Sequence, residues 1–170
     1  ALLGPASVRT AVLGAIASGN DTALHWLEAR ACSVRVKGEV VPAVGWTAAS
    51  FRHLTSRALD PFPHHHNVVA SGVETADGTR HALDARGLYR HCVGASALAT
   101  AEMRYRLTED LGVRWRRSAS GGWEVDGVPE PVLREFSRRR AEIDAAIAEL
   151  EAAIGRTTTI EELQTVVAAT

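Results

Sequence analysis

The sequence predicts an α+β fold in which an antiparallel β-sheet carries a three-histidine metal site and is flanked by helices. Three observations support this fold class. Apolar residues recur at helical spacing at the start of the chain, over residues 86–111 and near the end. Short runs of β-branched and aromatic residues between them are bounded by turn residues, as strands are. Four of the seven histidines lie in one segment, 51–66.

Length and composition favour a single domain. A chain of 170 residues can bury one proper core but not two large ones. The net charge is −1 and Lys37 is the only lysine, so positive charge is local and almost wholly arginine.

Cys32 and Cys92 form no paired framework, which suits a reducing, cytoplasmic location. No apolar run approaches the roughly 20 residues of a membrane span, so we expect no membrane partner. The chain starts without a methionine, and we expect it to be part of a longer protein.

Two helices are predicted first. Apolar residues at helical spacing indicate an amphipathic helix over residues 5–17, and the Ser18-Gly19 pair is expected to end it. Asn20 or Asp21 can then cap a second helix.

Strands follow these helices. A short strand is predicted at residues 33–36, and residues 38–42 are expected to turn the chain into a second strand over 46–55. Pro63 marks the start of a third strand over 64–75, which the Val68-Val69 pair favours.

The third strand places two histidines on one face. Side chains alternate along a strand, so His64 and His66 point to one side and His65 to the other. Their Cα atoms would be roughly 6.6 Å apart, a span across which both rings can reach one ion at about 2.1 Å. A loop and a returning strand would bring His53 beside them. Three neutral imidazoles with open positions are typical of a catalytic or ligand-binding ion; the alternative interpretation is a solvated histidine tract.

The position of another predicted turn indicates whether Glu74 and His81 could reach this ion. Asp77-Gly78 is a strong signal for a two-residue hairpin turn, which would place Glu74 opposite His81. Both would lie roughly 26 Å from His66 along the strand. We therefore expect neither of them to bind the metal.

The rest of the chain is predicted to be helical apart from one hairpin. The first is a core-covering helix that begins at Asp84 or Arg86 and reaches Leu111-Gly112. It is followed by a hairpin of 113–117 and 123–125 with its turn at 118–122, a helix over 138–154 capped by Ser137, and a last helix from a capping box at Thr159 to about Ala168. The hairpin combines arginines with Trp115 and Trp123, as in proteins that bind single-stranded nucleic acid, although a solvated hairpin with one buried tryptophan is the alternative. Arginines at 138–140 oppose the helix dipole, so phosphate contact is one candidate reason for them.

The segment 51–66 has the pattern F-x-H-x-T-S-R-x-x-D-P-x-x-H-x-H. It resembles the metal-binding motif of conjugative relaxases of the TraI/TrwC (MobF) type, within the HUH endonuclease superfamily, in which a histidine also stands eleven residues before a His-x-His pair. The resemblance extends from about Trp46 to Ile147 and includes residues 82–89, 101–104 and 136–140. This sequence departs from the pattern at Phe62-Pro63, where the family usually has Gln-Leu, so Pro63 puts the local strand pairing in doubt.

The resemblance implies an enzyme that nicks and rejoins single-stranded DNA at an origin of transfer through a tyrosyl-phosphodiester bond. It implies that a divalent ion (Mg, Mn or Zn) is held by His53, His64 and His66. Asp60 would orient the loop or a ligand, although an ordinary Asp-Pro turn residue is the alternative. The residues expected to contact DNA are Arg57, Ser56, Arg138 and Arg139.

No catalytic residue is expected within this sequence. The family's nucleophilic tyrosines lie near the N-terminus, whereas Tyr89 and Tyr105 fall on one predicted helix, roughly 160° apart around it. We therefore expect residues 1–155 to be a partial relaxase domain without the catalytic-tyrosine region, and residues 156–170 to be its C-terminal helix. The expected partners are an origin-of-transfer strand and the rest of the same polypeptide, which would include an upstream tyrosine segment; the sequence leaves open whether a helicase follows downstream. We expect a monomer that is inactive alone.

Two other functions fit parts of the sequence. One is a non-catalytic module that binds single-stranded DNA, in which mutation of the histidines would leave DNA binding intact. The other is a cupin-like metal enzyme, but that fold usually places a glutamate a few residues after His-x-His, and Glu74 is too distant.

Overall fold

The computed structural model describes residues 4–118 and 121–170. Its elements in chain order are α1 (Ala6–Ala31), β1 (Ser33–Val36), β2 (Glu39–Gly45), β3 (Ala48–Thr55), β4 (Pro61–Val69), β5 (Gly72–Thr75), β6 (Arg80–Ala82), α2 (Arg86–Leu111), β7 (Trp115–Arg117), β8 (Trp123–Val125), α3 (Glu130–Glu135), α4 (Arg138–Ile154) and α5 (Ile160–Ala169). They divide into two compact units. The first unit comprises the chain up to His53 with Pro63–Asp126, and the second comprises Leu54–Phe62 with Gly127–Thr170. The predicted α+β class, with antiparallel strands and flanking helices, is confirmed.

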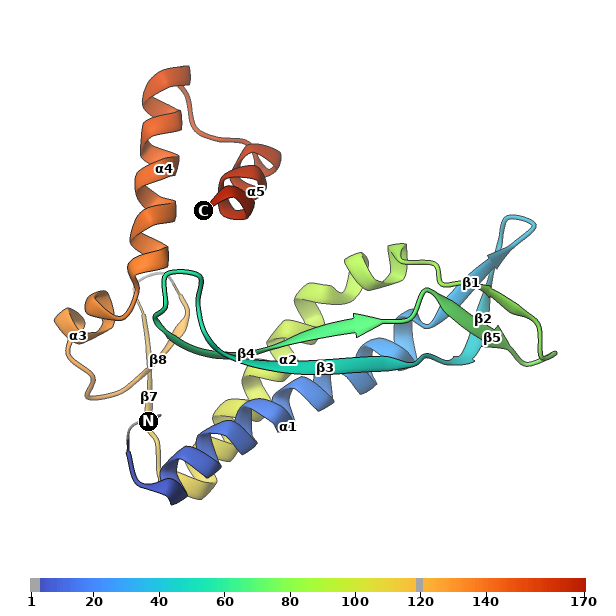
Figure 1. Cartoon of the computed structure of the whole chain (residues 1–170), viewed down its shortest axis with the longest axis horizontal. Coiled ribbons are helices and arrows are strands. Elements are labelled where there is room, and N and C mark those ends of the chain that lie inside the picture. Colours follow the sequence, from blue (N-terminus) through green and yellow to red (C-terminus); the bar gives the residue numbers. More distant parts are fainter. Residues whose placement is uncertain (1–3, 119–120) are drawn as a thin grey trace. The chain divides into compact units, whose positions relative to one another are not determined.

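Two long antiparallel helices, α1 and α2, form the scaffold of the first unit (Figure 1). A Cβ atom at Gly19 would lie 2.5 Å from the carbonyl oxygen of Ala99, so only glycine allows the backbones to approach this closely. The predicted helix end at Ser18-Gly19 is therefore wrong, since Gly19 marks a helix contact within one continuous helix. Neither Asn20 nor Asp21 caps a helix, because both lie in the interior of α1.

A small antiparallel sheet with the strand order β1-β2-β5-β6 holds the core of this unit. Val34 and Val73 are buried together with Cys32, and a bridge from Val34 to Leu83 connects β1 to the chain just beyond β6, so the sheet curls. Strand β2 was not predicted. The turn that was expected over 38–42 is confined to Lys37 and Gly38, which both have positive φ angles.

The single strand predicted over 64–75 is two strands that belong to different sheets. Strand β4 pairs with β3 as a two-stranded ribbon, whereas β5 joins the curled sheet. Strand β4 begins at Pro61 and continues through Pro63, which a two-stranded ribbon tolerates because each strand has one unpaired edge.

The register of the β5–β6 hairpin also differs from the prediction. Val73, not Glu74, lies opposite His81, and Glu74 pairs with Arg80. The backbone N–H of Thr75 donates to the carbonyl of Thr79, so three residues separate the paired positions and the register shifts by one.

The hairpin β7–β8 is confirmed, and positions 119 and 120 of its predicted turn lie outside the described residues. Arg114 forms an ion pair with Asp126, and Arg116 forms one with Glu124.

Among the described residues, no helix is both long and apolar enough to cross a bilayer.

The second unit contains α3, α4 and α5, of which α3 was not predicted. The capping box at Thr159 is confirmed: its side chain accepts from the backbone N–H of Glu162, and the Glu162 carboxylate accepts from the backbone N–H of Thr159. Arg156 also binds Glu162, and these contacts lower the pKa of that carboxyl to about 2.

Candidate metal centre and nucleic-acid-binding residues

Three histidines converge on the β3–β4 ribbon in the first unit. His53 lies on β3, and His64 and His66 lie two residues apart on β4. One ligand nitrogen from each ring lies within 4.8 Å of the others, and the ring centroids are 4.4 to 5.5 Å apart. The predicted convergence of these rings is confirmed.

The donor set fits a divalent ion with open coordination positions. His64 Nε2 and His66 Nε2 are 3.0 Å apart, which is about the separation of two nitrogens bound at a right angle to one ion at about 2.1 Å. His53 and His66 are exposed and His64 is half-buried, so water or a substrate oxygen can reach the remaining positions. Three imidazoles with accessible open positions are the pattern of a catalytic centre and not of a closed structural one.

Asn20 links α1 to both strands that carry the histidines. Its side-chain Nδ2 donates to Ser50 Oγ at 3.1 Å, on β3. Its Oδ1 accepts from Asn67 Nδ2 at 2.7 Å, on β4 beside His66. Sequence reasoning offered Asn20 or Asp21 as a helix cap and missed this role, because nothing local in the sequence identifies partners 30 and 47 residues away.

His65 does not belong to the cluster that the described residues form. Its Nδ1 is buried and has no hydrogen-bond partner within residues 4–118 and 121–170. Burial, and then the positive charge of Arg52, lower the pKa of His65, which keeps the ring neutral at pH 7.

Asp60 is the centre of a separate polar network in the second unit. It is only 3% exposed. Its Oδ1 accepts from Arg138 Nε at 2.7 Å, and its Oδ2 accepts from the backbone N–H of Arg139 at 3.3 Å. The hydrogen bond from Arg138 is the main cause that lowers the pKa of Asp60. Asp60 therefore orients its own loop and the start of α4.

Asp60 also takes the role that was predicted for Ser137. Ser137 occupies the N-cap position of α4, but its side chain makes no cap hydrogen bond. Its hydroxyl donates to the carbonyl of Leu133 instead. Ser137 is confirmed as the N-cap residue, but its side chain does not cap the helix, because the carboxylate that accepts from the first turn comes from a distant loop.

The residues that were predicted to contact DNA all lie in the second unit and all have protein partners. Arg57 Nη1 donates to the carbonyl of Ala168, and Arg139 Nη2 donates to that of Val167. These carbonyls are at the C-terminal end of α5, where unpaired backbone oxygens attract cations. Ser56 Oγ accepts from the backbone N–H of Asp60. Their contact with DNA remains a prediction.

Comparison with known proteins points to one family. A family model described as TrwC relaxase matches residues 1–170. The search of curated protein sequences finds no match.

Solved structures similar to this chain include a conjugative relaxase TrwC in complex with origin-of-transfer DNA in a copper-bound form, with 25% identity over 94% of this chain and a TM-score of 0.79. A metal-bound complex of TrwC with the same kind of DNA has 25% identity over 93% of this chain and a TM-score of 0.78. TrwC with a 27-mer DNA that comprises the recognition hairpin and the cleavage site has 25% identity over 99% of this chain and a TM-score of 0.80. This chain covers 55%, 55% and 59% of those chains, a little over half.

Proposed function

This chain belongs to the TrwC relaxase family, and we propose that it forms the metal-binding and DNA-binding part of a conjugative relaxase, which nicks and rejoins one DNA strand at an origin of transfer. The convergence of His53, His64 and His66 is the observation that carries this proposal. Residues 1–155 are, in this proposal, part of one relaxase domain, and residues 156–170 are its C-terminal helix.

The proposed metal ligands are the three histidines, and the proposed ion is Mg, Mn or Zn. The separation of 3.0 Å between His64 Nε2 and His66 Nε2 supports these ligands, and the copper-bound and metal-bound structures of TrwC support the presence of a metal ion. A bound divalent ion polarises a scissile phosphate and offsets the negative charge that develops on it. The β3–β4 ribbon holds the rings in place, and Asn20 bonds to both of its strands.

The proposed DNA contacts are Arg57, Ser56, Arg138 and Arg139. Guanidinium groups match the geometry of phosphate oxygens, and the related TrwC structures contain origin-of-transfer DNA. Asp60 supports this role indirectly, because its hydrogen bonds fix Arg138 and the first turn of α4.

We place the nucleophilic tyrosine outside residues 1–170. The only tyrosines here are Tyr89 and Tyr105, both on α2 and 80% and 57% exposed. Roughly 160° separates them around the helix, so they do not form a pair. The chain is then inactive by itself, and the proposed protein is a cytoplasmic monomer whose catalytic tyrosine comes from another part of the same polypeptide.

A nicking assay tests this proposal. The chain is incubated with a labelled single-stranded oligonucleotide that spans an origin of transfer, with Mg²⁺ or Mn²⁺. We expect DNA binding that weakens steeply as salt rises, without a covalent protein–DNA adduct. A covalent adduct would refute the placement of the nucleophile, and no binding at any salt concentration would refute the DNA-binding role.

A non-catalytic module for single-stranded DNA is the second candidate. One observation favours it: two guanidinium groups lie over the Trp123 ring, that of Arg117 at 4.1 Å and that of Arg104 at 4.9 Å from the ring centroid. Aromatic faces and cations together bind unpaired bases. In this case His64→Ala and His66→Ala would leave DNA affinity unchanged, while Trp123→Ala would reduce it.

A further inference from the structure

A hollow of about 690 Å³ lies along α2 in the first unit, beside strand β8. We call it the α2 hollow, and the residues that matter for its properties are Val93, Ser96, Ala97, Thr100 and Arg104 of α2 with Trp123 of β8. Its lining is mainly apolar, and it is open along the helix and not enclosed. It therefore suits an elongated partner better than a small molecule, which is usually held in a cleft that buries most of its surface.

Large apolar side chains on this side of α2 are exposed to solvent. Val93 is 78% exposed, and Tyr89, one helical turn earlier, is 80% exposed. The side chains that follow, Ser96 and Ala97, are small and exposed, which leaves room for a second helix to approach. The hydroxyl of Thr100 already donates to the carbonyl of Ser96 at 2.8 Å. Contiguous exposed apolar surface of this kind is typical of a contact with another protein.

Positive charge at one end of the α2 hollow has no acidic counterpart. The guanidinium groups of Arg104 and Arg117 lie over the Trp123 ring, and neither forms an ion pair within the part of the chain that the structure describes. The other two arginines of the same hairpin are both paired with carboxylates. No carboxylate among the described residues lines the hollow. A partner that carries carboxylates would therefore complement this end.

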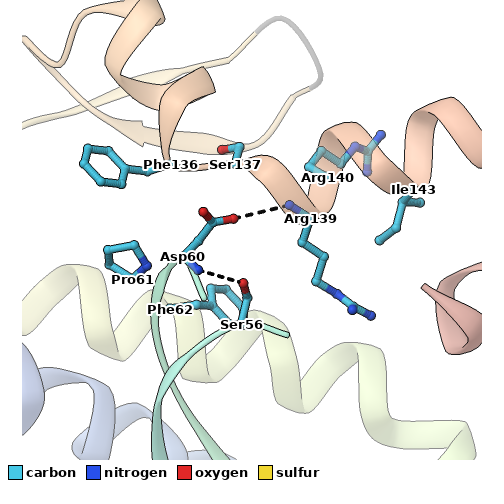
Figure 2. Close-up of a pocket in the computed structure, with 9 residues that line it drawn as sticks. All are labelled: Ser56, Asp60, Pro61, Phe62, Phe136, Ser137, Arg139, Arg140 and Ile143. Atoms are coloured by element: carbon cyan, nitrogen blue, oxygen red, sulfur yellow. Dashed lines mark hydrogen bonds between the residues drawn. The ribbon is translucent and has the colours of Figure 1, made fainter. Parts of the chain in front are cut away.

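The pocket before α4 differs from the α2 hollow in this respect (Figure 2). Arg140 pairs with Asp144, and Arg139 Nη2 donates to the carbonyl of Val167. The one carboxylate that lines this pocket, Asp60, is also bonded already. Its polar groups are thus used within the second unit, and the α2 hollow is the better candidate for an external partner.

We propose that the α2 hollow binds an acidic amphipathic helix of a partner protein, with apolar side chains against Val93 and Ala97 and carboxylates beside Arg104. Helices bind in such places through apolar anchors at positions i, i+3, i+4 and i+7. A DNA strand fits less well, because it carries a phosphate at every nucleotide and residues 93–100 include no cation. The inference goes beyond the proposed function, which needs no protein partner at α2.

The test uses three fluorescein-labelled synthetic peptides of equal length. The first has leucine at positions i, i+3, i+4 and i+7 and glutamate or alanine elsewhere. The second has lysine in place of each glutamate, and the third has the residues of the first in an order that forms no apolar face. Fluorescence anisotropy gives the Kd of each peptide for the unaltered chain, and single-stranded (dT)20 is measured in parallel.

Two variants alter the α2 hollow, and each has a matched control. Val93→Ser removes apolar surface, and Arg104→Glu reverses the charge at one end. Val44→Ser is the control for the first, because Val44 on β2 is 74% exposed and does not line the hollow. Arg80→Glu is the control for the second, because Arg80 is an exposed arginine on β6.

We expect the unaltered chain to bind the acidic amphipathic peptide at least tenfold more tightly than the other two peptides. Val93→Ser should weaken this binding roughly fivefold, which corresponds to about 1 kcal/mol. Arg104→Glu should weaken binding of the acidic peptide and strengthen binding of the lysine peptide, because like charges repel and opposite charges attract. A reversed preference also rules out a general defect of the fold. Both controls should leave every Kd unchanged.

The inference is overturned by any of three results. The first is equal or absent binding of the acidic amphipathic peptide and its reordered form. The second is an effect of the control variants as large as that of Val93→Ser or Arg104→Glu, which would indicate general attraction to the surface of the chain. The third is binding of (dT)20, and of none of the peptides, that weakens in Val93→Ser and Arg104→Glu. That result would make the hollow a DNA contact and leave the proposed function intact.

Discussion

The histidine ribbon of the first unit and the Asp60 network of the second unit differ in how their polar groups are used, although one motif, residues 51–66, contributes to both. In the ribbon, three imidazoles face one another with ligand nitrogens within 4.8 Å. In the network, Asp60 is nearly buried and its carboxylate is occupied by Arg138 and the start of α4. The histidines are therefore arranged for an external ligand, whereas Asp60 is arranged to hold its loop against the start of α4.

The largest effect is expected from removal of two imidazoles. Zn²⁺ or Mn²⁺ should raise the Tm of the unaltered chain, because an ion that binds only the folded state stabilises it. The double variant His64→Ala/His66→Ala should lose this rise completely, as measured by differential scanning fluorimetry. His81→Ala, on β6, is the control and should keep it. An unchanged rise in the double variant would mean that the ligands lie elsewhere.

The next largest effect is expected at the close contact between α1 and α2. In Gly19→Ala, the new Cβ meets the Ala99 carbonyl at 2.5 Å, and α1 and α2 must separate. We expect a loss of about 1–3 kcal/mol in the free energy of unfolding, measured with urea. Gly14→Ala is the matched control, since a Cβ there meets nothing within 4 Å and alanine favours the helix. Equal behaviour of the two variants would refute the close helix contact.

A smaller effect is expected from Asn20→Ala. It distinguishes a residue that orients the metal-binding histidines from one that stabilises the fold. Asn20→Ala removes the hydrogen bonds to Ser50 and Asn67, both at exposed positions, so the Tm without metal should change little. Zn²⁺ affinity should fall by about tenfold, the lower end for residues that orient metal ligands. Isothermal titration calorimetry measures it. If Asn67→Ala has the same effect and the double variant Asn20→Ala/Asn67→Ala is no worse, the two residues act through one contact.

The smallest effect concerns Asp60, and it should leave metal binding untouched. Asp60→Asn should lower the Tm by a few degrees at pH 7 without changing Zn²⁺ affinity. The pKa of Asp60 is lowered in the folded state, mainly by Arg138. Its stabilising contribution is therefore complete above the ordinary pKa of 3.8 and is lost as the pH falls through the lowered value. Urea midpoints at a series of pH values should show the difference between the variant and the unaltered chain shrinking below pH 3.8. A difference that persists unchanged at the lowest pH would contradict this assignment.

Local sequence patterns predicted the parts of this molecule that depend on neighbours in the chain. The alternation of His64 and His66 along a strand, the long helix α2 and the capping box at Thr159 follow from spacing alone. The convergence of His53 with that pair required only one turn between adjacent strands.

The parts that sequence reasoning missed depend on partners far along the chain. Gly19 has the appearance of a helix end until Ala99 lies against it. Asn20 has the appearance of a cap until Ser50 and Asn67 are its partners. Asp60 accepts from Arg139, 79 residues away. In each case a residue with a familiar local role has a different one because tertiary contacts outweigh a weak local preference.

X-ray absorption at the zinc edge of the Zn²⁺-loaded chain is the most direct measurement of the proposed metal centre. The account predicts three imidazole nitrogens at about 2.0–2.1 Å, with the remaining positions filled by water oxygen, and a shell that loses two imidazoles in His64→Ala/His66→Ala. A shell of oxygens alone, or one that is the same in the double variant, would contradict it.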